Sequence, residues 1–248
     1  MSSTTQIPAP ISGRSEAGPG ETLVYIVRHA QTAWNLEKRF QGQLDVALSD
    51  EGRTQSRAVA DWLYSQQVSF SAVYASDLQR AWHTAQSIAE RLGLVPEPVQ
   101  ALREIHAGNW QGLLPTEIEE RYPGQPARWY TEANEFRLPG GETIPEVRAR
   151  VHGWYMKTID AHRGQAIVVV SHGMAIRSLL SALNGWDVAD TERMKAAAMG
   201  NTGVTALLAD HERGQSSVLF FNSLAHLENA AHPQSQGAVE RTNEPATV

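Results

Sequence analysis

The amino-acid sequence contains no cysteine among its 248 residues. This absence excludes disulfide bridges, zinc–thiolate sites, iron–sulfur clusters and a thiol nucleophile. The sequence also has no glycine-rich phosphate-binding loop and no internal repeat. Any catalytic chemistry must therefore come from other side chains.

Long apolar runs and an excess of positive charge are missing as well. No stretch approaches the roughly 20 apolar residues that span a bilayer, and the longest candidate, residues 166–170, has the length of a buried strand. Lys and Arg number 21 against 27 Asp and Glu, which gives a formal net charge of −6. Such a chain has no global attraction for nucleic acid or an anionic membrane, so an anion-binding site requires a local cluster of positive groups.

The two ends of the chain are polar. Residues 1–20 and 230–248 are poor in apolar residues and contain several prolines, so we predict disordered tails around a single domain at 21–229. Residues 1–20 also lack the basic start and apolar run of a signal peptide, and we therefore expect a cytoplasmic protein.

Between the tails, short apolar runs alternate with helical patterns. The runs typical of strands are 23–28, 72–76, 166–171, 204–208 and 217–221. The predicted helices are one capped by Ser49, one from Asp77 to Gly93 with Ser76 as its cap, one from Pro145 to Gly164, and one over 174–183. Strands separated by helices predict β-α-β crossovers, and hence an α/β fold with a largely parallel sheet covered on both faces.

One long segment departs from this alternation. Residues 103–143 carry Gly, Pro, Trp and charged residues in short clusters, with brief helices predicted around 117–122 and 127–132. We interpret its main part, about 105–143, as an irregular helical cap segment over one face of the sheet, where binding residues often lie.

Two predicted strands end in histidine. Arg28 and His29 follow the first strand, and His172 follows the strand at 166–171. Because ligands bind beyond the carboxyl ends of parallel strands, these side chains are expected to meet at one edge of the sheet. The helix after the strand at 72–76 brings Arg80 to the same edge.

Two arginines and two histidines suit a phosphoryl group. Guanidinium groups match its several charged oxygens, and they disfavour protonation of a neighbouring imidazole, which leaves a nucleophilic nitrogen. Histidine is a workable nucleophile toward phosphorus. A leaving alkoxide also needs a proton from a carboxylic acid, for which Glu104, at the start of the irregular segment, is the best candidate.

Other interpretations of the same residues stay open at this point. An Arg–His pair at a strand end is, by itself, more often a structural hydrogen-bonding pair than an active site. His29 and His172 could also ligate a metal, but no carboxylate stands at ligand spacing beside them and two arginines would repel the ion. The joint pattern therefore favours an anion site over either alternative.

At these residues the chain resembles the histidine phosphatase, or phosphoglycerate mutase-like, superfamily. The resemblance covers roughly residues 22–222, and Arg28-His29-Ala30 corresponds to the Arg-His-Gly start of the family signature. The motifs that carry it are VRHAQTAWN (27–35), RFQGQLDVALSDEGRTQS (39–56), YASDLQRAWHTA (74–85), LREIHAGNWQGL (102–113), GGET (140–143) and SHG (171–173).

The resemblance implies a role for each matching residue. His29 is similar to the nucleophile that becomes phosphohistidine, and Glu104 matches the general acid/base. The rest of the phosphate pocket corresponds to Arg28, Arg80 and His172, with Asn35 and Gln41 where the family often adds contacts. The family mechanism uses no metal and no cofactor. The fold that the resemblance implies is a three-layer α/β/α sandwich with a mostly parallel central sheet.

Ala30 departs from the family signature, which has glycine at this position. A positive φ at an alanine would cost about 1 kcal/mol or more. We expect a slight adjustment of the backbone rather than loss of activity.

The expected partner is a small phosphorylated substrate, with no nucleic acid and no membrane. The segment around residues 102–113 resembles the bacterial phosphatase branch, which favours a phosphomonoesterase over two alternatives, a mutase and a non-catalytic phospho-ligand binder. Many relatives are dimers, so a homodimer stays open. For the leaving group, aromatic and basic residues of the cap segment are candidates for contact: Trp110, Trp129, Tyr130, Phe136, Arg103, Arg128 and Arg137.

Overall fold

The computed structural model describes residues 16–231, so the predicted tails lie outside the described residues except for 16–20 and 230–231. Six strands form one sheet in the order β3-β2-β4-β1-β5-β6. Their bounds are β1 Glu21–Arg28, β2 Phe70–Ala75, β3 Pro96–Pro98, β4 Gln165–Ser171, β5 Val204–Asp210 and β6 Gln215–Ser223. β1, β2, β3 and β4 are mutually parallel, whereas β5 runs antiparallel to both of its neighbours. The predicted, mostly parallel sheet is confirmed.

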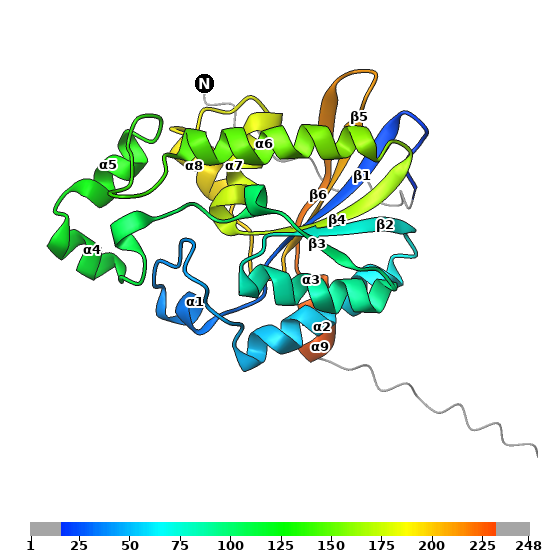
Figure 1. Ribbon diagram of the computed structural model, residues 1–248, viewed down its shortest axis with the longest axis horizontal. Helices are drawn as coiled ribbons and strands as arrows, with labels where there is room; N and C mark the ends of the chain where they lie inside the picture. Colours follow the sequence, from blue (N-terminus) through cyan, green and yellow to red (C-terminus); the bar gives the residue numbers. More distant parts are fainter. Residues whose placement is uncertain (1–15, 232–248) are drawn as a thin grey trace, which may run out of the picture.

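Helices cover both faces of this sheet (Figure 1). Along β1, Leu23, Tyr25 and Val27 face a cluster built with α2 and α3, whereas Val24 and Ile26 face a cluster built with α6 and α7. This alternation follows from the two-residue period of a strand, and it explains why the middle of β1, from Leu23 to Val27, is apolar on both faces. The three-layer α/β/α fold is thus confirmed. The helices are α1 Ala33–Glu37, α2 Asp50–Ser65, α3 Gln79–Leu92, α4 Pro115–Arg121, α5 Gln125–Thr131, α6 Ile144–Ala161, α7 Gly173–Leu183, α8 Thr191–Ala196 and α9 Ala225–Ala231.

The predicted helix boundaries agree with the structure at Ser49 and Gly93 but not at Ser76 or Gly164, since α6 ends at Ala161 with His162 as its C-cap. Ser49 Oγ accepts the N–H of Gly52 at 3.0 Å, and Gly93 ends α3 in the left-handed conformation, both as predicted. The predicted cap at Ser76 is wrong, because α3 begins only at Gln79. A distant carboxylate does the capping instead: Asp45 Oδ1 accepts the N–H of Gln79 at 2.7 Å.

The cap segment carries α4 and α5, which extend beyond the sheet (Figure 1). Each begins two residues earlier than predicted, because a proline occupies the first or second helical position. Trp110, only 1% exposed, packs edge-on against Phe40 and Trp129 with ring centroids 5.6 and 5.7 Å apart. These rings fix the cap segment to the rest of the domain. Among residues 16–231, no helix has the length and apolar character needed to cross a membrane.

Candidate active site

The ends of β1 and β4 bring the two histidines together. The strands pair in register up to Arg28 and Ser171, and the N–H of His29 donates to the carbonyl of Ser171 at 2.9 Å. His172 is the next residue and forms the N-cap of α7. The rings of His29 and His172 consequently lie 5.1 Å apart between centroids, at the sheet edge where the sequence predicts them.

His29 is buried and fixed in one orientation. Its Nδ1 lies 2.7 Å from the carbonyl oxygen of Ala30. Because a carbonyl can only accept, Nδ1 carries the proton and Nε2 keeps its lone pair. Burial, followed by the positive charges of Arg80 and Arg28, holds the pKa of His29 well below its usual value of 6.5. The imidazole is therefore neutral near pH 7, with Nε2 available for attack.

Two buried guanidinium groups flank His29. Arg80, 1% exposed, donates to the carbonyls of Gly42 and Leu44 at 2.7 and 2.9 Å, and burial lowers its pKa to about 10. Arg28 donates to the carbonyl of Met199 at 2.5 Å. The Nε atoms of both arginines are buried and have no partner in the described residues. The carbonyls that orient the other guanidinium nitrogens are uncharged, so they do not neutralise the positive charge of either arginine. Both guanidinium groups can therefore bind an anion.

Glu104 lies at the N-terminus of α7. Its Oε1 accepts the N–H groups of Ile105, Met174 and Ala175 at 3.0, 3.0 and 3.1 Å. A Cβ added at Gly173 would lie 3.7 Å from Glu104 Oε2 and 3.9 Å from Arg28 Nε, so the carboxylate and this guanidinium flank the same glycine. The carboxylate is thereby held beside the arginines.

Arg150, which the sequence analysis does not single out, holds the backbone that presents Glu104. Its guanidinium donates to the carbonyls of Ala101, Arg103 and Glu104 at 2.8, 2.7 and 2.9 Å, and it pairs with Glu142 at 2.9 Å. Nothing in a linear sequence indicates this contact, because a residue of α6 supports a loop 46 positions earlier.

Asn35 and Gln41 also line the site. Asn35 Oδ1 accepts the N–H of Thr32 at 3.0 Å and the side-chain amide of Asn201 at 3.3 Å, which leaves the Asn35 amide N–H groups without a partner in the described residues. The side-chain oxygen of Gln41 is buried and likewise unpaired within that part of the chain. Both side chains therefore retain polar atoms for a ligand.

These residues surround a cavity of about 260 Å³. His172 is fully buried and is not among the lining residues, but its ring centroid lies 5.1 Å from that of His29 and neither of its ring nitrogens has a partner in the described residues. The lining residues are Arg28, His29, Asn35, Phe40, Gln41, Gly42, Arg80, Glu104, Ile105, Trp129, Tyr130, Gly173, Met174 and Arg177. The structure thus brings together every predicted site residue, with His172 beside His29 but outside the cavity lining.

The candidates for leaving-group contact divide into two groups. Trp129 and Tyr130 line the cavity, whereas Trp110 and Phe136 are buried in the apolar core. The three arginines among these candidates are engaged elsewhere. Arg103 pairs with Asp77, Arg128 with Glu132 and Arg137 with Glu146. Arg177 reaches the cavity instead. Its position five residues after His172, on the same face of α7 as Met174 and Gly173, could have indicated this.

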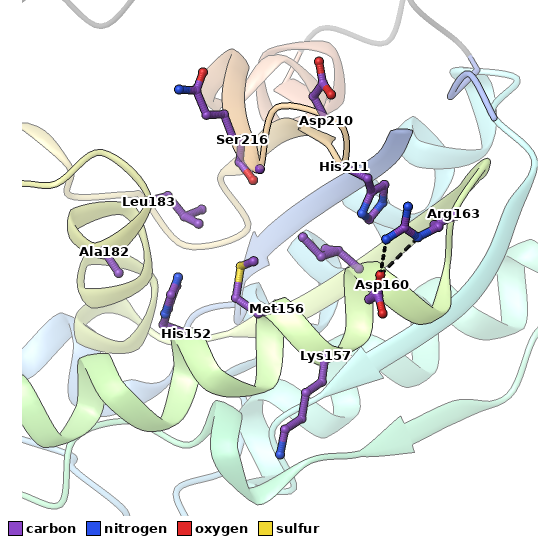
Figure 2. A pocket seen from close by; sticks show the side chains of 13 residues that line it. His152, Met156, Lys157, Asp160, Arg163, Ala182, Leu183, Asp210, His211 and Ser216 are labelled. Carbon is purple, nitrogen blue, oxygen red and sulfur yellow. Dashed lines mark hydrogen bonds and ion pairs between the residues drawn. The ribbon is translucent and has the colours of Figure 1, made fainter. Parts of the chain in front are cut away.

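A second cavity, of about 570 Å³, lies at the other end of β1 and β4 (Figure 2). It lies between the C-terminal half of α6 and the β5–β6 turn, and its lining includes Lys157, Asp160, Arg163 and His211. Arg163 is paired with Asp160 within it, and His211 lies 2.9 Å from the hydroxyl of Thr22. Its larger volume does not make it the phosphate site, because its lining carries two carboxylates, Asp160 and Asp210, beside its two cations, Lys157 and Arg163.

Comparison with known proteins identifies the family. The model of the histidine phosphatase superfamily (branch 1) matches residues 24–222. The chain belongs to the histidine phosphatase superfamily. The family predicted from the motifs is therefore confirmed.

Histidine phosphatase relatives carry several functional names. Phosphoserine phosphatase 1 of Hydrogenobacter thermophilus is 33% identical over 202 residues, which cover 82% of this chain and 92% of that protein. The glucosyl-3-phosphoglycerate phosphatase of Mycobacterium tuberculosis is 36% identical over 190 residues, covering 73% and 83%. A 2,3-bisphosphoglycerate-dependent phosphoglycerate mutase of Gloeobacter violaceus is 34% identical over 178 residues, covering 70% and 80%.

A solved histidine phosphatase structure shares the fold. The native mycobacterial glucosyl-3-phosphoglycerate phosphatase superposes with a TM-score of 0.73 at 33% identity, covering 82% of this chain and 99% of that one. Phosphatases and mutases thus both resemble the chain.

Ala30, which replaces glycine in this histidine phosphatase, is not strained. It is absent from the residues with positive φ, its side chain is fully buried, and its N–H donates to Thr84 Oγ1 at 3.0 Å. The expected cost of a left-handed alanine is therefore not incurred.

Ala30→Gly is expected to change kcat/KM by less than about threefold and to lower the free energy of unfolding by about 1–2 kcal/mol, because glycine gains unfolded-state entropy and a buried methyl is lost. Steady-state kinetics and urea unfolding check both values. A large gain in turnover would show instead that alanine impairs the pocket.

Three buried histidines predict how stability depends on pH. Burial and nearby arginine charge hold the pKa values of His29 and His172 well below 6.5 in the folded protein, and burial lowers the pKa of His226 to about 4. Below about pH 6.5 these histidines are protonated in the unfolded chain but not in the folded chain. The free energy of unfolding therefore falls as the pH falls, by up to about 1.4 kcal/mol per pH unit for each histidine.

Urea unfolding at pH 7.5, 6.5 and 5.5 measures this slope. His29→Asn is expected to show a shallower slope than the wild-type protein, because one of the three buried imidazoles is gone. Stability that is unchanged between pH 7.5 and 5.5 would contradict the assignment of neutral buried histidines.

Proposed function

We propose that the protein is a metal-independent phosphomonoesterase that hydrolyses a small phosphorylated metabolite through a phosphohistidine on His29. The observation that supports this most strongly is the His29 imidazole itself. Its Nδ1 is occupied by the carbonyl of Ala30, its Nε2 is free, and Arg28 and Arg80 stand beside it in the same cavity. A neutral nucleophile between two cations suits attack on a dianionic phosphoryl group.

In the first step, Nε2 of His29 attacks phosphorus, and the bond between phosphorus and the ester oxygen breaks. Arg28 and Arg80 stabilise the charge on the equatorial oxygens, with their buried Nε donors already unpaired. His172 is neutral but keeps one ring N–H for the same oxygens. Glu104 gives its proton to the leaving oxygen, so the alcohol departs uncharged.

In the second step, water replaces the alcohol. Glu104, now ionised, accepts a proton from the water, whose oxygen attacks phosphorus as the bond to Nε2 breaks. The products are inorganic phosphate and free His29. Each atom of the cycle is supplied by substrate, water or these side chains, so the proposed mechanism needs neither a metal nor a cofactor.

A mutase is the second candidate, because named phosphoglycerate mutases match the chain. The difference is which hydroxyl attacks phosphohistidine: water in a phosphatase, a second substrate molecule in a mutase. The relatives named as phosphatases act on phosphoserine and glucosyl-3-phosphoglycerate, and we propose a substrate of that size. Non-catalytic binding is disfavoured because His29, Glu104 and both arginines are all present at the cavity.

A panel of phosphorylated metabolites tests the proposal. Phosphate release is expected for at least one of them in the presence of a strong chelator, with substrates ranked by kcat/KM. Transfer of phosphate between 2- and 3-phosphoglycerate faster than release to water would support the mutase instead. Absence of both phosphate release and phosphate transfer with every ester would contradict both.

A further inference from the structure

Arg177 has no role in the proposed reaction, yet it lines the active cavity. It lies on α7, whose N-terminal residues Met174 and Ala175 hold the Glu104 carboxylate. Met174 is three residues before Arg177 and lines the cavity beside it. The guanidinium thus belongs to the same wall as the proposed acid, on the side where the leaving group departs.

This guanidinium is unpartnered. No hydrogen bond or ion pair joins its side chain to any residue in 16–231, and its Nε is buried without an acceptor. The contrast with other arginines near the cavity is clear, since Arg28 and Arg80 are anchored by carbonyls and Arg103 is paired with Asp77. A buried donor without a partner is costly unless a ligand satisfies it.

With Arg177, the cavity carries more positive charge than a phosphate group alone can balance. Burial is the main cause that lowers the pKa of Arg28, and repulsion from the nearby Arg177 lowers it further. When Glu104 carries the proton that it must donate, the cavity presents three positive charges, those of Arg28, Arg80 and Arg177. A phosphomonoester dianion balances two of them, so one positive charge is left for a second anionic group.

The surroundings of Arg177 indicate where that group lies. Trp129, Tyr130, Met174 and Arg177 also line a small cavity of about 30 Å³ whose other walls include Val188 and Met194 of the α8 region. Arg177 therefore marks the boundary between the polar phosphate pocket and an apolar wall beneath α5. A compact leaving group that reaches this boundary would place an anionic group against the guanidinium and carbon against Met174 and Tyr130.

We propose that Arg177 is a specificity-determining residue that binds a carboxylate on the leaving group, so that the substrate is a phosphorylated carboxylic acid. The inference deepens the proposed function and rests on it. A planar guanidinium matches a carboxylate with two parallel N–H donors. Hydrogen bonds to charged groups contribute enough to change kcat/KM by about 10- to 100-fold.

The test compares two esters that differ only in that group. 3-Phosphoglycerate carries a carboxylate where glycerol 3-phosphate carries a hydroxymethyl group. The wild-type protein is expected to have a higher kcat/KM for 3-phosphoglycerate than for glycerol 3-phosphate. If turnover is too slow to measure, the same preference is expected in the Kd values of the two esters for His29→Ala, which binds them without turnover. Arg177→Gln is expected to remove about 10- to 100-fold of that preference, and Arg177→Lys a smaller part of it.

Lys157→Gln is the matched control, because it removes one positive charge from the distant second cavity (Figure 2). It should leave the preference between the two esters unchanged. No preference in the wild-type protein, or an equal loss for both esters in Arg177→Gln, would overturn the proposal. A preference that depends on Arg177 for fructose 1,6-bisphosphate over fructose 6-phosphate, without one for the carboxylate, would assign the site to a second phosphate and overturn the carboxylate.

Hydrolysis of p-nitrophenyl phosphate separates this inference from the proposed function. Its leaving group has no carboxylate and reports the His29 chemistry alone. Release of nitrophenol by the wild-type protein together with no carboxylate preference overturns only the role of Arg177. No release from any ester, with no binding preference, overturns both.

Discussion

His29→Ala is expected to lower kcat/KM by at least about 10³-fold for every phosphomonoester, because the variant has no nitrogen that could accept the phosphoryl group. Direct attack by water, assisted only by the arginines, would account for the remaining rate. The imidazole makes one side-chain hydrogen bond, to the carbonyl of Ala30, so the fold does not depend on it heavily. Steady-state kinetics with p-nitrophenyl phosphate and with the best metabolite measure the effect.

The matched control is His83→Ala, the same substitution on the exposed side of α3. It should retain wild-type kinetics. Circular dichroism and thermal unfolding of His29→Ala verify that the protein is folded. Activity of folded His29→Ala within tenfold of the wild-type value would exclude His29 as the nucleophile.

Glu104→Gln is expected to lower kcat by about 10²- to 10⁴-fold for alkyl phosphates, because their leaving oxygen needs a proton. The amide oxygen of glutamine can still accept the N–H groups of Ile105, Met174 and Ala175, so the side chain keeps its place at α7. For p-nitrophenyl phosphate, whose leaving phenolate is weakly basic, formation of phosphohistidine should slow by less than about tenfold. Single-turnover kinetics separate this step from hydrolysis of the intermediate.

The difference between the two esters is the internal control in this experiment. A merely structural role for Glu104 would slow both esters equally. Equal losses for the alkyl and the nitrophenyl ester would therefore contradict the assignment of Glu104 as the general acid.

The sequence is informative about the site where the chain itself forces residues together. Arg28, His29 and His172 follow two strands that pair in parallel, so their convergence requires only the strand order. Arg80 lies in the first turn of the helix after β2, the strand on the other side of β4. Glu104 follows no predicted strand, so its place at the start of the irregular segment and its match to the family motif are what indicate it.

The remaining features depend on contacts between distant segments. Asp45 replaces Ser76 as the cap of α3, and Arg150 supports the Glu104 backbone from α6, although neither pairing leaves a local pattern. β3 is a three-residue strand with two prolines, which propensity excludes, and it forms only because the edge of β2 is available to it. Arg177 was overlooked because its helical face, rather than a motif, brings it to the cavity.

The central claim is that the phosphoryl group is bound covalently to His29 during turnover. The most direct measurement mixes the protein with excess substrate, quenches the reaction rapidly without acid, and then determines the intact protein mass and the phosphorylated peptide by mass spectrometry. We predict a mass gain of one phosphoryl group that is stable in alkali, labile in acid, located on the peptide containing His29, and absent in His29→Ala. Phosphate release with no phosphorylated protein at any quench time, or with the phosphoryl group on another residue, would contradict the account.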